Sequence, residues 1–209
     1  MTASVWILPP FAHVAHLSTC VRRDDTMSMP LASYFTADAV RALPDDGKRY
    51  ETVHGELLVT PAPGGFHQRV LSRLHFDIYG YLAANGNEDV LFAPADISWG
   101  GDTLVQPDLF VADLAEFNRS GKWADVRTLY LAVEIVSPSS ARADRFTKRR
   151  LYQEQRIPEY WVIDIDQRHV EVWTPDALFP VVERKQLTWR HPSIDAGCVV
   201  DLVRLFAQG

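Results

Sequence analysis

Residues 129–140 read LYLAVEIVSPSS, and this stretch decides the fold. An apolar run of this length, closed by Ser137-Pro138, is typical of a strand covered on both faces of a sheet. Glu134 stands inside the run, where an ionised carboxylate costs free energy unless a positive group meets it. The strand therefore predicts a central position in the sheet and a partner for its acid.

A second acid occupies the apolar run that precedes this strand. Asp108 follows Pro107 and leads into Leu109-Phe110-Val111. Two carboxylates that converge at the edge of neighbouring strands can bind Mg²⁺ or Mn²⁺, hard ions that take oxygen ligands. Such an ion would offset the repulsion between the two acids and could activate a water. Asp108 and Glu134 are therefore candidate metal ligands.

The stretch after the strand is predicted to be a basic helix over residues 143–155. Asp144, Lys148 and Tyr152 are four residues apart and line one stripe of it. In an acidic protein, basic residues concentrated beside two carboxylates favour contact with a phosphodiester backbone. A solvated basic helix with a single Asp144–Lys148 pair fits the same pattern, so the helix alone leaves both interpretations open.

The remaining elements follow from periodicity and turn residues. A short helix over 37–43 is capped by Thr36, a hairpin joins 50–53 to 56–59 through Gly55 at positive φ, and a long helix runs from Phe66 to Asn85-Gly86. Residues 113–128 are predicted to be a polar loop. Further strands are predicted over 89–99, 104–112, 159–164 and 169–173, with weaker candidates over 180–183 and 198–203.

Length and composition are those of one globular domain. We expect a single domain over residues 29–209 and an extension over residues 1–28, which is flexible or reflects a start site placed too far upstream. The net charge of −6 argues against a protein that simply coats a polyanion. The two cysteines have no metal-binding spacing, and no apolar run reaches the ~18 residues of a membrane span. A cytoplasmic protein without membrane contact is expected.

The ordered motifs resemble the PD-(D/E)XK phosphodiesterase superfamily and, within it, the Uma-two restriction endonuclease family. The matching residues span about residues 36–175 and are Tyr50-Glu51, Gly55-Glu56, His67, Pro107-Asp108, Glu134 to Ser139, Asp144, Lys148, Tyr152 and Pro158 to Trp161. The resemblance implies an α/β (α+β) fold with a restriction-endonuclease-like core, in which helices flank a mixed central sheet.

The resemblance also implies a catalytic set of Asp108, Glu134 and Lys148, with Asp108 and Glu134 as ligands of Mg²⁺ or Mn²⁺. The superfamily's lysine usually lies two residues after the strand glutamate, where this chain has Val136. Members of the resembling family supply it from the next helix, which points to Lys148. Its ammonium would orient the attacking water or steady the scissile phosphate.

Five further residues are candidates for contacts around the site or with substrate: Glu56, His67, Asp96, Asp144 and Tyr152. Glu56 and Asp96 are equally well explained as edge-strand acids that face water. His67 shares the sheet-facing stripe of its helix and fits a satisfied core residue as well as a ligand. Tyr152 is expected to pack or donate a hydrogen bond near the site.

These features predict a divalent-metal-dependent endonuclease that hydrolyses phosphodiester bonds of DNA. The alternative is a nuclease-like module that binds nucleic acid or a protein partner without cutting, because a fold does not determine a function. A homodimer is expected as well, since cutting both strands of a duplex takes two active sites.

Overall fold

The computed structural model describes residues 33–86 and 90–208, which all belong to one compact unit. The expected extension over residues 1–28, with Cys20, lies outside the described residues. Within the described ranges, no helix combines the length and the apolarity needed to cross a membrane.

The core is a mixed sheet of six strands in the order β3-β4-β5-β6-β7-β8. All neighbours are antiparallel except β5 and β6, which run parallel and are joined by a helical crossover. The expected mixed sheet flanked by helices is confirmed. The strands are β3 (Val90–Phe92), β4 (Leu109–Ala112), β5 (Leu129–Val136), β6 (Glu159–Asp164), β7 (His169–Trp173) and β8 (Val181–Glu183).

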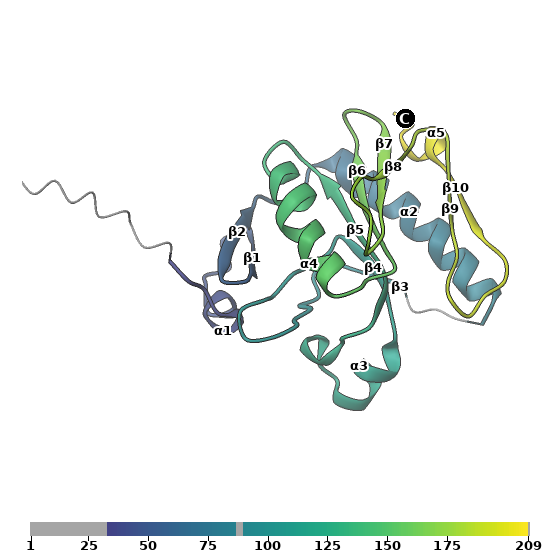
Figure 1. Cartoon of the computed structure of the whole chain (residues 1–209). Helices are drawn as coiled ribbons and strands as arrows, with labels where there is room; N and C mark the ends of the chain where they lie inside the picture. Colours follow the sequence, from purple (N-terminus) through teal and green to yellow (C-terminus); the bar gives the residue numbers. More distant parts are fainter. Residues whose placement is uncertain (1–32, 87–89, 209) are drawn as a thin grey trace, which may run out of the picture. The chain divides into compact units, whose positions relative to one another are not determined.

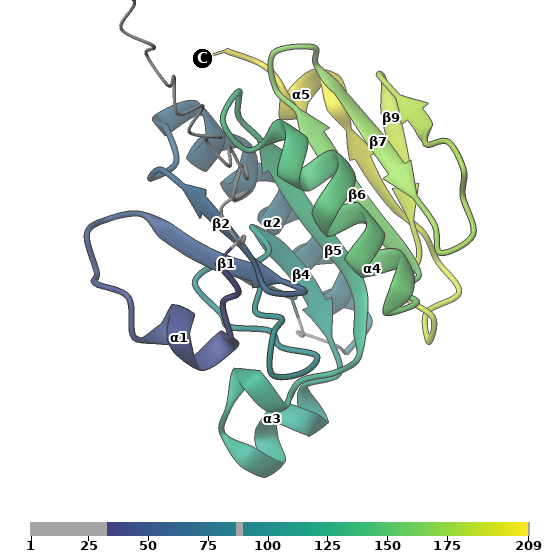
Figure 2. The same ribbon diagram turned by 60° about the vertical axis from the view of Figure 1, so that its left-hand side comes forward.

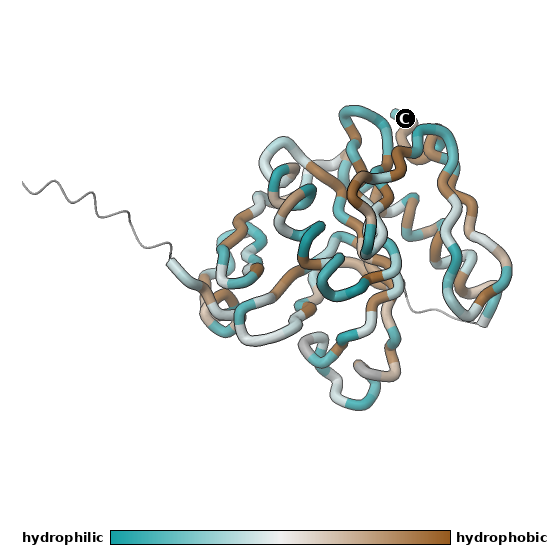
Figure 3. The backbone as a smooth tube through the Cα atoms, viewed as in Figure 1, coloured by the Kyte–Doolittle hydropathy of each residue, from teal (hydrophilic) through white to brown (hydrophobic). Residues whose placement is uncertain are grey.

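Both faces of the sheet are covered (Figures 1 and 2). On one face lie the long helix α2 (Gly65–Ala84), the hairpin of β9 (Gln186–Trp189) and β10 (Cys198–Asp201), and α5 (Leu202–Leu205). On the other lie η2 (Ala143–Lys148), its continuation α4 (Arg149–Glu154), and the hairpin of β1 (Arg49–Val53) and β2 (Glu56–Thr60). Figure 3 shows hydrophobic residues along the strands between these layers.

The alternation of β5 decides where its acid points. Val133 and Ile135 belong to the hydrophobic cluster under α2, whereas Ala132 and Val136 belong to the cluster under α4. Successive side chains of a strand face opposite sides. Glu134 therefore points to the α4 side, toward the basic helix.

Several predicted boundaries are correct. α1 (Ala37–Arg41) begins after Thr36, whose hydroxyl accepts a hydrogen bond from the amide of Ala39. The hairpin turn has positive φ at Gly55, and β5, β6 and β7 have the predicted limits. These elements carry strong local signals, a cap, a turn glycine or a continuous apolar run.

Other predictions were wrong. The strand over 89–99 ends at Phe92, because Pro94 has no N–H for the ladder, and the strand over 104–112 begins only at Leu109. The loop over 113–128 contains α3 (Leu114–Ser120), capped by the Asp113 side chain, and the short η1 (Trp123–Asp125). Strand β9 was not predicted, and the strand over 198–203 turns into α5 after Asp201, which caps that helix.

Candidate active site

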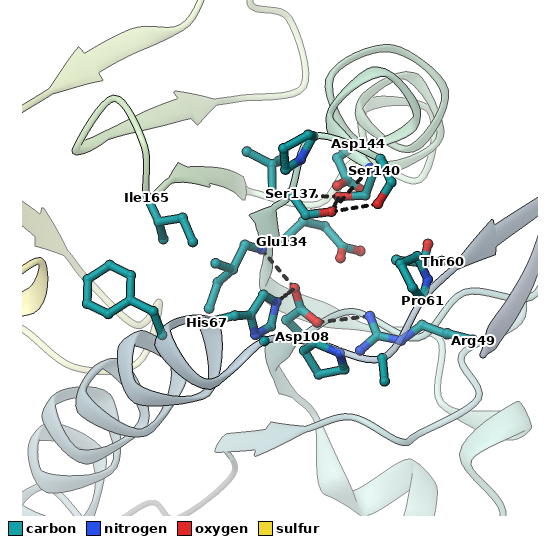
Figure 4. A pocket seen from close by; sticks show the side chains of 18 of the residues that line it. Arg49, Thr60, Pro61, His67, Asp108, Glu134, Ser137, Ser140, Asp144 and Ile165 are labelled. Atoms are coloured by element: carbon teal, nitrogen blue, oxygen red, sulfur yellow. Dashed lines mark hydrogen bonds and ion pairs between the residues drawn. The ribbon is translucent and has the colours of Figure 1, made fainter. Parts of the chain in front are cut away.

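A pocket of about 250 Å³ opens where β4 and β5 meet the start of α2 and the crossover to η2 (Figure 4). It is lined by the segment from Thr60 to Gly64, by the serine-rich turn from Ser137 to Ser140, and by charged side chains from four elements. Those residues are Arg49, His67, Asp108, Glu134, Asp144, Lys148 and Asp166. Five of these seven belong to the predicted candidates, and all three predicted catalytic residues line this one pocket.

Asp108 stands opposite Glu134 because of strand register. β4 pairs with β5 so that Leu109 faces Val133, and Asp108, the residue just before β4, therefore comes beside Glu134, the residue just after Val133. The carboxylate of Asp108 is held on both oxygens. Its Oδ2 accepts hydrogen bonds from the amide of Ile135 at 2.8 Å and from Nε2 of His67 at 3.1 Å.

Its other oxygen, Oδ1, accepts a hydrogen bond from Nη1 of Arg49 at 2.9 Å. Burial alone would raise the pKa of Asp108, but the hydrogen bond from His67 and the charge of Arg49 outweigh it and lower the pKa to about 2. Asp108 is therefore an anion at neutral pH.

Glu134 is held through a single oxygen. Its Oε1 accepts hydrogen bonds from Nζ of Lys148 at 3.0 Å and from the hydroxyl of Tyr152 at 3.1 Å. The other oxygen, Oε2, makes no hydrogen bond to any described residue. The stripe predicted from the spacing of Asp144, Lys148 and Tyr152 thus faces the sheet, and two of its members bind the acid of β5.

Burial raises the pKa of Glu134 well above its ordinary value. Lys148 acts in the opposite direction, while the negative charges of Asp144 and Asp108 raise the pKa further. The two strand acids thus differ sharply in their affinity for a proton. Such a separation between neighbouring carboxyl groups is common at functional sites.

Lys148 is enclosed by three carboxylates. Its ammonium lies 2.7 Å from Glu51, 3.0 Å from Glu134 and 3.5 Å from Asp144, and its side chain is only 3% exposed. Burial favours the neutral amine, but the three acids outweigh it and raise the pKa of Lys148. Lys148 is consequently a fixed positive charge rather than a base.

The local shape of η2 brings Asp144 and Lys148 to the site. The predicted helix forms, but its first part is a π-helix, in which the amide of Arg149 bonds the carbonyl of Asp144 five residues earlier. Such wide turns are rare and occur mostly at functional sites. Both side chains are buried on the sheet side of the turn.

Two residues of the site, Arg49 and Glu51, were not among the predicted candidates. They are two positions apart on β1 and so share one face of the strand. Arg49 donates to the carbonyl of Gln106, and Glu51 accepts from the amide of Gln106, two residues before Asp108. Glu51 is fully buried. Glu51 belongs to the Tyr50-Glu51 match with the family, but the sequence does not reveal its partners, which depend on how the hairpin docks.

The remaining candidates are placed differently. His67 bonds Asp108 from the first turn of α2, and Asp144 pairs with Lys148. Glu56 is exposed next to the turn of the hairpin and does not line the pocket. Asp96 is bound by Gln106 and Arg41 outside the pocket. For these two, the interpretation as acids outside the site fits the structure.

The charges of the pocket suit a divalent cation. Four acidic side chains line it, those of Asp108, Glu134, Asp144 and Asp166, against the two basic ones of Arg49 and Lys148, a formal surplus of two negative charges with His67 counted as neutral. In the described part of the chain, no three His, Cys, Asp or Glu side chains form a ready-made metal cage. Mg²⁺ needs none, because one or two carboxylates and several waters commonly hold it. Asp108 and the unbonded oxygen of Glu134 fit that role.

Comparison with known proteins gives one family and one fold. The model of the Uma2 family, described as "Putative restriction endonuclease", matches residues 37–197. The chain is similar to the crystal structure of a putative nuclease belonging to DUF820 from Anabaena variabilis ATCC 29413, with 21% identity and a TM-score of 0.64 over 82% of this chain and 97% of that one. At this identity the likeness shows the fold alone. No curated protein matches.

Proposed function

The chain belongs to the Uma2 family of putative restriction endonucleases, as its motifs predicted, and from this premise we propose that it is a divalent-metal-dependent endonuclease acting on DNA. The observation that carries the proposal is that Asp108 and Glu134, brought side by side by the register of β4 and β5, line one pocket with surplus negative charge. The fold shared with a putative nuclease agrees with it.

Asp108 and Glu134 are the residues that would hold Mg²⁺ or Mn²⁺. When bound, such an ion lowers the pKa of a coordinated water and stabilises negative charge that develops on a phosphoryl group. The protein's own part is orientation. Ile135 and His67 fix the carboxylate of Asp108, and Lys148 and Tyr152 fix Oε1 of Glu134, which leaves Oε2 facing the pocket. Outer contacts of this kind set the direction of metal ligands.

One observation favours the non-cutting alternative. Asp108 already accepts three hydrogen bonds, one of them from the guanidinium of Arg49, so an ion would have to share this carboxylate with existing donors. A domain that only binds nucleic acid could keep such an ion pair as a structural feature. Metal binding and cutting must therefore be measured separately.

The test is nicking of supercoiled plasmid DNA in Mg²⁺ or Mn²⁺, with Asp108→Asn and Glu134→Gln as variants. We expect metal-dependent cutting by the wild type and a loss of at least about a hundredfold in each variant, the scale of one lost electrostatic contact to a transition state. Metal should also raise the melting temperature of the wild type. Saturation a hundredfold above the dissociation constant adds about 2.7 kcal/mol to the free energy of unfolding.

Glu56→Gln is the matched control, because it removes one carboxylate of the same domain at an exposed position outside the pocket. It should cut like the wild type. Cutting that survives in both site variants would refute the assignment of the site. A folded wild type that neither cuts nor gains stability from metal would leave the non-cutting module as the better description.

A further inference from the structure

The pocket contains two strong cations, and they differ in what they can still bind. An ammonium has three N–H donors. Those of Lys148 are surrounded by the carboxylates of Glu51, Glu134 and Asp144, at 2.7, 3.0 and 3.5 Å. Its ammonium donates a hydrogen bond to Oε1 of Glu134 and forms ion pairs with the other two acids, and with its side chain only 3% exposed it offers little surface to a substrate anion.

Arg49, in contrast to Lys148, keeps unused hydrogen-bond donors. Only its Nη1 is engaged, with the carbonyl of Gln106 at 3.0 Å and Oδ1 of Asp108 at 2.9 Å. Nε and Nη2 of Arg49 donate no hydrogen bond to any of residues 33–86 and 90–208. The side chain is 18% exposed and lines the pocket, and Figure 4 shows its guanidinium reaching from β1 to Asp108. A guanidinium has five donors, so Arg49 keeps a donor edge available.

His67, the third basic residue of the pocket, offers no accessible donor to a ligand. His67 uses Nε2 to bind Asp108, and its Nδ1 is buried away from the pocket's solvent without a hydrogen-bond partner. Among the described residues that line the pocket, Arg49 is the cation with donors accessible to a ligand.

We propose that Arg49 binds a phosphate of the DNA substrate, whereas Lys148 is a positioning residue that holds Glu134. The inference rests on the proposed function and assigns within it the residue that contacts substrate. A planar guanidinium can form paired hydrogen bonds to phosphate, which an ammonium cannot. The sequence-based expectation that Lys148 itself steadies the phosphate is replaced by this division of roles.

The β1 strand explains how both roles are kept in place. Arg49 and Glu51 lie on the same face of β1, and together they bond the carbonyl and the amide of Gln106. Arg49 is thereby anchored to a backbone carbonyl as well as to Asp108, so its guanidinium stays at the pocket when a phosphate arrives. Glu51, which is fully buried and does not line the pocket, at the same time forms an ion pair with Lys148.

The test measures binding instead of cutting. Fluorescence anisotropy of a short fluorescein-labelled DNA duplex is recorded in Ca²⁺, an ion that also takes oxygen ligands, at several salt concentrations, and a gel then verifies that the duplex is intact. Arg49→Gln should weaken binding about tenfold and reduce the slope of log affinity against log salt by about 1, the effect of one lost phosphate contact. Arg49→Lys should restore the slope but not the full affinity.

The slope separates the proposed role from a structural one. Loss of fold or of Asp108 geometry lowers affinity without removing one released counterion, whereas loss of a phosphate contact lowers the slope. Arg119→Gln, at an exposed position of α3 outside the pocket, is the matched control and should keep the wild-type slope. Melting temperatures verify that each variant is folded.

An Arg49→Gln protein that is folded and binds DNA with the wild-type slope would overturn the inference, even if the wild type cuts plasmid. A reduced slope in Lys148→Met with no change in Arg49→Gln would overturn it as well. Conversely, the wild type could fail to cut plasmid while Arg49→Gln lowers the slope of log affinity against log salt by about 1. That result would support the phosphate contact and reject nuclease activity.

Discussion

Lys148 shows how strongly a single buried charge organises its surroundings. Three carboxylates converge on its ammonium, and all four residues are buried. A buried charge left without its partner is among the most destabilising changes a protein can undergo. The residue therefore holds the site together whether or not it takes part in chemistry.

Replacing Lys148 by Met should lower the free energy of unfolding at neutral pH by about 3–5 kcal/mol, because uncompensated carboxylates remain buried. Burial already raises the pKa of Glu134 and of Asp144, and without Lys148 both groups bind protons more readily. Groups with a raised folded-state pKa stabilise the fold at low pH and lose that effect as pH rises. The difference in free energy of unfolding between the wild type and Lys148→Met should therefore be smaller at pH 5 than at pH 7.

Urea unfolding at the two pH values measures this effect, with Lys122→Met as the control at an exposed lysine. Equal stability of Lys148→Met and wild type at pH 7 would contradict the view that Lys148 compensates buried acids.

At the scale of elements, the π-helical segment η2 is tied to the sheet by a second group of charges. Arg145 donates to Asp164 of β6 at 2.6 Å and to Glu171 of β7 at 2.7 Å. Burial tends to raise the pKa of Asp164, but the hydrogen bond from Arg145 outweighs it and lowers the pKa below its ordinary value. The pairing connects η2 to two strands of the sheet.

Replacing Arg145 by Met should cost about 1 kcal/mol near neutral pH, since the pair is partly exposed and solvent screens it. A carboxyl group with a lowered folded-state pKa stabilises the fold above its ordinary pKa, and this contribution disappears as pH falls through the lowered value. The difference in free energy of unfolding between the wild type and Arg145→Met should thus be largest near pH 7 and should become smaller below about pH 4.

Urea unfolding across this range provides the measurement. Arg150→Met on the same helical stretch is the control, because its pair with Glu154 is largely exposed and should contribute less. A gap that stays constant down to pH 3 would show that Arg145 acts through packing instead of charge.

At the scale of the whole molecule, we predict a homodimer, because the proposed cutting of both DNA strands calls for two active sites. One chain offers a single pocket with Asp108 and Glu134, whereas two cuts in a duplex call for two such pockets. Multi-angle light scattering should give twice the mass of one chain at micromolar concentration, with or without DNA. A monomer under all conditions would limit the proposal to nicking of one strand at a time.

The sequence by itself determined the elements with strong local signals. The apolar run over 129–136 predicted the central strand, Gly55 predicted the hairpin turn, and the spacing of Asp144, Lys148 and Tyr152 predicted the stripe that faces the sheet. The family was also accessible, because its ordered motifs lie in the chain itself. These signals depend on neighbours within a few positions.

Only the tertiary structure decided which side chains meet. Arg49 and Glu51 lie more than fifty residues from Gln106, and nothing local marks them as partners of that backbone. Glu51 and Glu56 both matched family motifs in the same hairpin, but Glu56 lies outside the pocket, whereas Glu51 is buried against Lys148. The physical reason is that periodicity assigns a face to each residue, whereas the docking of a hairpin onto the sheet determines what that face contacts.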